Sequence, residues 1–167
     1  MGSSSQPDNA KILQLVGAIV LTSQDAERYL KAALPFTNSE DPSIGAVLKR
    51  HDKLKRRPLG ELAGKLVDAT TSDSLHFAGH LAQLVNERNQ VAHHFNEVYG
   101  AKLAAGQHQA VIESLEALLL NLKTFRSSLE QMVLALFESL RDVVYRGTPQ
   151  YKQMAELCAS FRARVVS

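Results

Sequence analysis

The segment Glu87–Phe95 holds the residue types in this chain that could do chemistry. It reads Glu-Arg-Asn-Gln-Val-Ala-His-His-Phe, so a guanidinium, an amide and two imidazoles lie close together in the sequence. Histidine titrates near neutral pH and can move a proton, whereas arginine carries a fixed charge that can hold a phosphate oxygen. Cleavage of an RNA phosphodiester needs both kinds of group. The residues that could carry such chemistry are Arg88, Asn89, His93 and His94, with Glu87 beside them as an auxiliary candidate.

Arg88 occupies an unexpected place in the helical pattern. Residues that step by four and three through it would share one face of a helix, and all but Arg88 are apolar: Phe77, Leu81, Leu84, Arg88, Val91 and Phe95. An isolated buried charge costs roughly several kcal/mol, so we expect Arg88 to find a partner, reach solvent or face a cleft. On an unbroken helix Arg88 and His93 lie about 140° apart. A helix break near Gln90, or a wide groove, would have to bring them together.

Two other kinds of site have weaker signals. His76 and His80 are four residues apart and Glu87 follows on nearly the same helical face, a spacing that a metal can use. The sequence lacks the paired Glu-x-x-His motifs of di-iron bundles, so we expect no metal and no cofactor. Cys158 has no sequence feature that would activate its thiol, which favours a buried structural cysteine. An ordinary polar helix end with incidental histidines remains an alternative for the whole segment.

The periodicity of the apolar residues predicts an all-α protein whose helices position this segment. The first helix should end at Pro35, and Gly100 is the expected stop of the helix that carries the candidate residues. The expected helices span 8–34, 58–70, 73–99, 108–145 and 150–165, with a short helical turn at 44–48. The sequence has neither an alternating strand pattern nor a glycine-rich phosphate loop.

The helix expected at 108–145 carries an apolar seam that alternates steps of four and three without a miss. Its members are Val111, Leu115, Leu118, Leu122, Phe125, Leu129, Met132 and Leu136. At 1.5 Å per residue this helix would be on the order of 55 Å long, longer than its expected neighbours. The excess length invites a second chain to cover it, and the seam is either intramolecular core or a dimer seam.

A basic segment at 49–57 sets six cations against one acid, Asp52. Two interpretations stay open: a solvated basic loop, or a patch that contacts RNA phosphates. The cations are Lys49, Arg50, Lys53, Lys55, Arg56 and Arg57.

The totals place the chain among ordinary globular proteins. It has 167 residues, 45% hydrophobic and 22% charged, with a formal net charge of +2, so any nucleic-acid role must rest on local clustering of charge. One cysteine excludes an intrachain disulfide and suits a reducing compartment, so we expect a cytoplasmic protein without a membrane span. Residues 1–7 are expected to be disordered or to derive from an expression vector.

The order of residues from Arg88 to His93 resembles the signature of the HEPN superfamily of all-helical domains, which is Arg, a polar residue, three residues and His. Leu59-Gly60-Glu61-Leu62 before the motif and a long helix after it are similar to the HEPN layout, so the resemblance covers most of 8–145. It implies a HEPN-like antiparallel bundle of four to five helices, with one long helix after the motif, as a single domain over 1–167. Residues 149–167 would be a C-terminal helical extension outside the resemblance.

The resemblance also implies a function. HEPN domains dimerise and bring two motifs to a shared cleft, and many are metal-independent endoribonucleases of toxin–antitoxin, phage-defence or CRISPR systems. Arg88 and His93 would be the catalytic pair and Asn89 their polar companion, with attack of the RNA 2′-hydroxyl on its own phosphodiester. Implied partners are RNA, a second copy, and an antitoxin or defence-system protein. Some two-gene toxins place Tyr two residues after the His, where this chain has Phe95; Tyr99, one turn further on, is an auxiliary candidate.

Two alternatives from other classes stay open. Many HEPN members are non-catalytic modules that bind RNA or protein, and in such a module Arg88 would act structurally. A DNA-binding helix-turn-helix repressor is less favoured, because no recognition helix with exposed basic and amide residues stands out.

Overall fold

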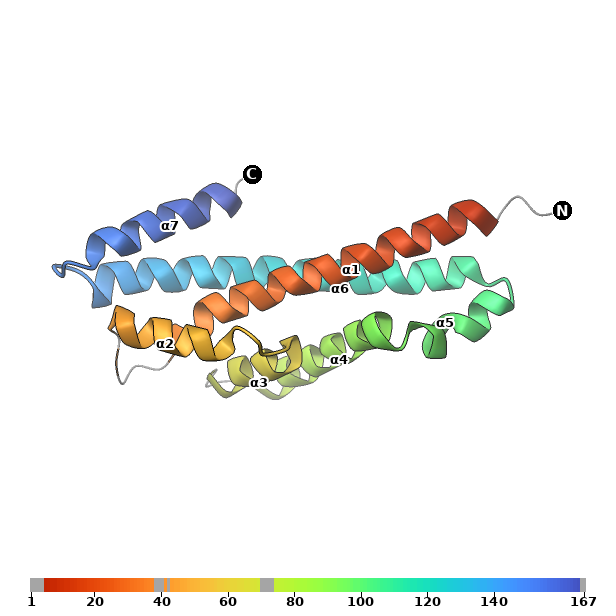
Figure 1. The fold of residues 1–167 in the computed structure, drawn as a ribbon, viewed down its shortest axis with the longest axis horizontal. Helices are drawn as coiled ribbons and strands as arrows, with labels where there is room; N and C mark the ends of the chain where they lie inside the picture. Colours follow the sequence, from red (N-terminus) through yellow and green to blue (C-terminus); the bar gives the residue numbers. More distant parts are fainter. Residues whose placement is uncertain (1–4, 38–40, 42, 70–73, 166–167) are drawn as a thin grey trace. The chain divides into compact units, whose positions relative to one another are not determined.

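The computed structural model describes residues 5–37, 41, 43–69 and 74–165, and within them it contains seven α-helices, two short helical turns and no β-strand. The predicted all-α class is confirmed, although the described helices outnumber the expected four to five. Figure 1 shows the helices in chain order. The elements are α1 (Ser5–Ala33), η1 (Leu34–Phe36), α2 (Ile44–Leu54), α3 (Leu59–Ala69), α4 (Ser74–His93), α5 (Phe95–Ala104), α6 (His108–Ser139), η2 (Leu140–Val144) and α7 (Tyr151–Val165).

The chain forms two compact units that share its two longest helices. The first unit comprises Met1–Ala26 and Thr70–Arg126, and the second comprises Glu27–Ala69 and Ser127–Ser167. Helices α1 and α6 each give their first part to the first unit and their last part to the second. The division describes compactness and does not identify a domain family, so a single HEPN-like domain over 1–167 stays a prediction.

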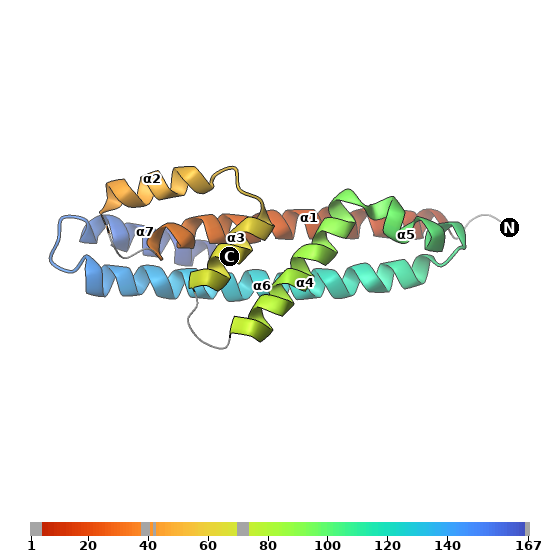
Figure 2. The same cartoon turned by 90° about the horizontal axis from the view of Figure 1, so that it is seen from below.

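In the first unit α1 and α6 run parallel. Lys11 Nζ lies 3.1 Å from Glu116 Oε1, and Asp25 Oδ2 lies 3.9 Å from Arg126 Nε, so the contacts advance in the same direction along both helices. This pair therefore departs from the predicted antiparallel packing, whereas α4 runs the opposite way to both (Figures 1 and 2). The unit buries apolar side chains from all four helices. They include Ile12, Leu15 and Ile19 of α1, Leu81, Leu84 and Val91 of α4, Tyr99 of α5, and Val111, Leu115 and Leu122 of α6.

The second unit has its own aromatic core. The rings of Phe36, Phe137 and Phe161 meet edge to face, with 5.4 Å between the centroids of Phe36 and Phe137 and 5.7 Å between those of Phe137 and Phe161. Helix α7 contributes Met154 and Cys158 to this core, both 2% exposed. Leu157, next to Cys158 on the same helix, turns away from this core and is 40% exposed.

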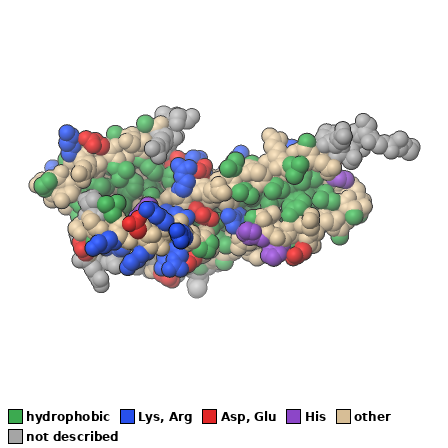
Figure 3. Space-filling view, viewed as in Figure 1, with side chains coloured by type: hydrophobic (Ala, Val, Ile, Leu, Met, Phe, Trp, Pro, Cys, Tyr) green, Lys and Arg blue, Asp and Glu red, His purple; other side chains and the backbone are tan. Residues whose placement is uncertain are grey.

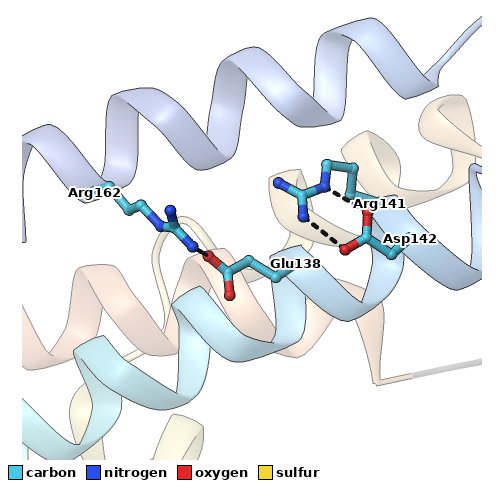
Figure 4. A network of polar contacts seen from close by, with 4 residues as sticks. All are labelled: Glu138, Arg141, Asp142 and Arg162. Atoms are coloured by element: carbon cyan, nitrogen blue, oxygen red, sulfur yellow. Dashed lines mark hydrogen bonds and ion pairs between the residues drawn. The ribbon is translucent and has the colours of Figure 1, made fainter.

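Polar contacts also hold α7 to α6 at the surface of this unit. Figure 4 shows Arg162 of α7 pairing with Glu138 of α6, while Arg141 binds its neighbour Asp142 through two hydrogen bonds of 2.7 and 2.6 Å. The Arg141 guanidinium holds the pKa of the Asp142 carboxyl below its usual range. Because these groups are largely in contact with solvent, we assign them a role in orienting side chains and little in stability.

The apolar seam of α6 changes its register in the second unit. The predicted members are buried as far as Leu129, but Met132 is 37% exposed, while Val133 and Phe137 are 0% and 3% exposed. An α-helix repeats every 3.6 residues, so a strict heptad face drifts around it, and a step of four restores contact with a straight neighbour. The predicted inward position Met132 is thus replaced by Val133, while the predicted Leu136 is partly buried against the same core beside the fully buried Phe137.

Candidate functional site

The helix that carries the candidate residues is broken immediately after His93. His94 has φ −127° and ψ 25°, which is not helical, and α5 begins at Phe95. The prediction of one continuous helix as far as Tyr99 is therefore wrong. The predicted stop at Gly100 is wrong too, because α5 continues to Ala104.

The actual stop is Gly106, which has a φ of +74° that only glycine adopts readily. Its N–H donates to the Leu103 carbonyl at 3.0 Å, and the Gln107 N–H donates to the Lys102 carbonyl at 2.9 Å. This pair of bonds closes the end of α5 in a Schellman arrangement.

Local hydrogen bonds define the position of the break. The N–H of His94 still donates to the carbonyl of Gln90 at 3.0 Å, so the ladder of α4 is intact through the whole motif. The carbonyl of His94 accepts from the N–H of Val98 at 3.1 Å, which starts the next ladder. The Nδ1 atom of His94 lies 3.0 Å from Glu97 Oε2, in the first turn of α5. A carboxylate there is favourable because the first N–H groups of a helix carry partial positive charge.

Arg88 resolves the conflict between its charge and its apolar surroundings by partial burial and a local hydrogen bond. Its side chain is half-buried between turns that place Leu84 and Val91 in the core, each 2% exposed. Its Nη1 donates to Asn89 Oδ1 at 3.0 Å, and Arg88 has a further interaction beyond this pair. The amide of Asn89 thus fixes one end of the guanidinium, as a residue that positions a charge for an anion would require.

His93 lies apart from this pair. His93 is the last residue of α4 and its side chain is exposed. Its imidazole makes no hydrogen bond or ion pair with any residue that the structure describes. Because the break follows His93 rather than separating it from Arg88, the two side chains keep the angular separation of an unbroken helix. The structure therefore brings Arg88 to Asn89 but does not bring His93 to either within one chain.

The auxiliary candidates have different surroundings. Glu87 is half-buried and accepts a hydrogen bond of 2.8 Å from Gln83 Nε2. Tyr99 is 8% exposed, and its ring centroid lies 5.1 Å from that of Phe95. Burial, with a smaller effect of the Glu87 charge, raises the pKa of the Tyr99 phenol. Tyr99 is thus a core residue of the first unit, and His94 and Glu97 are the polar groups beside the break.

The basic segment is more ordered than the predicted loop. Helix α2 runs through Leu54, well beyond the short turn expected at 44–48, so the interpretation of this segment as a loop is wrong for residues 49–54. Ser43 caps α2, since its Oγ accepts from the N–H of Ala46 at 3.3 Å. After α2 a tightened turn follows, in which the N–H of Lys55 donates to Asp52 O and that of Arg57 to Leu54 O.

The other chemical candidates are not assembled into sites. Among the described residues no group of three or more His, Cys, Asp or Glu side chains could hold a metal ion. The side chain of His76 lies outside the described part, and His80 is exposed. Burial raises the pKa of the Cys158 thiol, which keeps it protonated and unreactive. No helix in the described part of the chain is long and apolar enough to cross a membrane.

One buried polar pair has no counterpart in the expectations from sequence. Tyr29 Oη donates to Glu130 Oε1 at 2.6 Å, and Glu130 is only 6% exposed. The signal for Glu130 in the sequence is its position directly after the seam residue Leu129. A heptad face rotates slowly around an α-helix, so positions next to the seam can turn toward the core.

Comparison of the chain with protein-family models, with curated proteins and with solved structures finds no match in any of the three.

Proposed function

We propose that this protein is a metal-independent endoribonuclease of the HEPN type, active as a homodimer and serving as a toxin or phage-defence effector. The observation that carries the proposal is the arrangement at the end of α4. There the exposed His93 is the last residue of the helix. Arg88, five residues earlier, is half-buried, and its guanidinium donates a hydrogen bond to Asn89. The resemblance of Arg88 to His93 to the HEPN signature gives this arrangement its chemical interpretation.

The chemistry follows from the two residue types. The 2′-oxygen of the RNA attacks the adjacent phosphorus, while His93 as a base takes the 2′-hydroxyl proton or as an acid supplies one to the leaving 5′-oxygen. One O–P bond forms and one breaks, which leaves a 2′,3′-cyclic phosphate and a 5′-hydroxyl. Arg88 holds the phosphoryl oxygens as their negative charge develops, and no metal is needed.

A second copy of the chain supplies what one copy lacks. Arg88 and His93 lie on different sides of α4, so within one chain their side chains point in different directions. Two copies that meet at this helix would set the Arg88 of one beside the His93 of the other. They would also provide two imidazoles, so that one could act as base and the other as acid.

The test is cleavage of a single-stranded RNA pool by purified protein in EDTA, with the ends of the products identified. Cyclic-phosphate and 5′-hydroxyl ends are expected, with activity reduced at least about 100-fold in His93→Ala and in Arg88→Ala. His80→Ala is the matched control, because it removes an exposed histidine from the same helix. Equal cleavage by the His93→Ala protein, or full dependence on a divalent metal, would contradict the proposal.

A non-catalytic RNA- or protein-binding module is the second candidate function. It is favoured by the setting of His93, because catalytic bases are usually oriented by another group and no described residue hydrogen-bonds this imidazole. A binding module predicts RNA or protein binding without product formation. It also predicts that Arg88→Ala lowers the free energy of unfolding more than His93→Ala does, as measured in denaturant melts.

A further inference from the structure

We propose that the outer face of α2, with the turn that follows it, binds the phosphate backbone of single-stranded nucleic acid through Lys49, Lys53 and Arg56. These three residues are called the α2 cation row below. The row lies in the second unit, whereas the candidate catalytic residues lie in the first. Binding by the row is therefore independent of whether the protein cleaves RNA.

The structure divides the six cations of the basic segment into two groups. Three serve the protein itself: Arg50 donates to the carbonyls of Pro35 and Asp41, each at 2.7 Å. Lys55 Nζ lies 2.7 Å from Asp52 Oδ1, and Arg57 Nη1 lies 3.2 Å from Glu61 Oε2.

The α2 cation row makes up the second group. All three of its side chains are exposed, and they make no hydrogen bond or ion pair with any described residue. Three of the six cations of this segment are thus available to a ligand, and they lie close together in the sequence.

These three charges share one side of the element. Lys49 and Lys53 are four residues apart on α2, which places them on one face with a rise of about 6 Å. The turn after α2 has hydrogen bonds over three residues, so Arg56 follows Lys53 at one tight turn and keeps the same side. The buried residues of α2, Val47 and Leu54, each precede a member of the row by two positions and so face the opposite way.

The described acidic groups near the row, Asp41 and Asp52, offset its charge only in part. Asp52 is held by Lys55, whose hydrogen bond and charge keep the pKa of that carboxyl below its usual range. Hydrogen bonds from Ser43 lower the pKa of Asp41 most, and the charges of Arg50 and Lys49 lower it further, so Asp41 offsets part of the Lys49 charge. Figure 3 shows Lys and Arg side chains gathered over the α2 region. Because the whole chain carries only +2, this row is a local excess of positive charge.

A row of separate exposed cations suits a polyanion better than a single phosphate. Each exposed contact contributes little by itself, because water and salt screen it, so a single phosphate would bind weakly. A nucleic-acid strand engages several at once and releases counterions from each neutralised phosphate. An anionic membrane is less suited, because a helix that lies on a bilayer must expose a broad apolar face. Helix α2 buries Val47 and Leu54 in the protein and exposes only Leu48 beside the row among its large described apolar residues.

The test compares two variants with the same net charge. One carries Lys49→Gln, Lys53→Gln and Arg56→Gln, and the other carries Lys102→Gln, Lys123→Gln and Lys152→Gln, three exposed lysines outside α2. Each triple variant has a formal net charge of +2 − 3 = −1. Both are made with His93→Ala, so that no cleavage disturbs the measurement. Fluorescence anisotropy then gives the affinity for oligo(U) and oligo(dT) over a range of salt concentrations.

The variant of the α2 cation row is expected to bind about 10-fold or more weaker at low salt, with a salt slope smaller by about 2, since each lost phosphate contact removes roughly 0.7. Oligo(U) and oligo(dT) should behave alike, because phosphate contacts do not report the sugar. An equal loss in the control variant, or an unchanged salt slope, overturns the proposal. So does binding of phosphatidylserine vesicles, in place of oligonucleotides, that depends on the row.

Discussion

At the scale of single residues, the structure answers how a charge can occupy a core position of α4. Arg88 follows Leu81 and Leu84 in the apolar repeat, yet it is only half-buried and its guanidinium bonds Asn89. Partial exposure lowers the desolvation cost that full burial would impose. The two motif residues that are adjacent in sequence are therefore joined, while His93 stays in solvent. This explains why Arg88 could be singled out from the sequence but its contact could not.

A second residue-scale prediction concerns the buried pair of Tyr29 and Glu130. Tyr29→Phe should lower the free energy of unfolding by about 1–3 kcal/mol, because a buried carboxylate loses a short hydrogen bond while the ring stays. The edge contact of that ring with Phe161, at 5.6 Å between centroids, is retained in the variant. Urea denaturation followed by circular dichroism measures the difference.

The control for that prediction is Tyr151→Phe, which removes the hydroxyl of a tyrosine that is 40% exposed. It should change the free energy of unfolding by less than about 0.5 kcal/mol. Equal stability of the Tyr29→Phe variant and the unaltered protein would show that the hydroxyl contributes nothing net.

At the scale of elements, the main finding is the way helices end or shift where the sequence pattern continues. The repeat of apolar positions continues from Val91 to Phe95 across the break at His94. Similarly, the seam of α6 passes through Met132, although the buried residue is Val133. Periodicity reports which residues are apolar, but the neighbour against which a helix packs decides which of two adjacent positions is inside.

The shift in α6 gives a direct stability prediction. Val133→Ala should lower the free energy of unfolding by about 2 kcal/mol, because it opens space at a fully buried position. Met132→Ala should cost clearly less, since that side chain already contacts solvent. The two variants, compared in the same denaturant series, separate the observed register from the heptad register. A larger loss for Met132→Ala would contradict the register seen here.

At the scale of the whole molecule, the two units divide the candidate functions between them. The motif from Arg88 to His93 lies in the first unit, and the α2 cation row lies in the second. The proposed active site needs two copies of the chain, so oligomeric state is the property of the whole molecule that matters most for function. Light scattering with size-exclusion chromatography measures it directly.

A mixing experiment tests the shared site at this scale. Arg88→Ala and His93→Ala proteins, each inactive alone, are combined after mild denaturation and refolding, so that about half of the dimers contain one copy of each. If the site combines residues of both chains, each mixed dimer keeps one intact Arg88 beside one intact His93, and part of the RNA cleavage should return. A mixture as inactive as its components would mean that the two residues act within one chain or not at all. The unaltered protein carried through the same refolding is the control.

The sequence by itself determined the helical class, the approximate ranges of most helices, the residues that could do chemistry and the clustering of positive charge. These follow from properties that are local in the chain: apolar spacing, the limits set by Pro35, and residue type. Only the tertiary structure decided that α4 breaks at His94, that Arg88 meets Asn89, and that Val133 replaces Met132 in the core. It also decided which cations of the segment 49–57 bind other groups of the same chain. Each of these outcomes depends on the direction a side chain takes and the neighbour it meets after folding, and the spacing of apolar residues carries no signal for either.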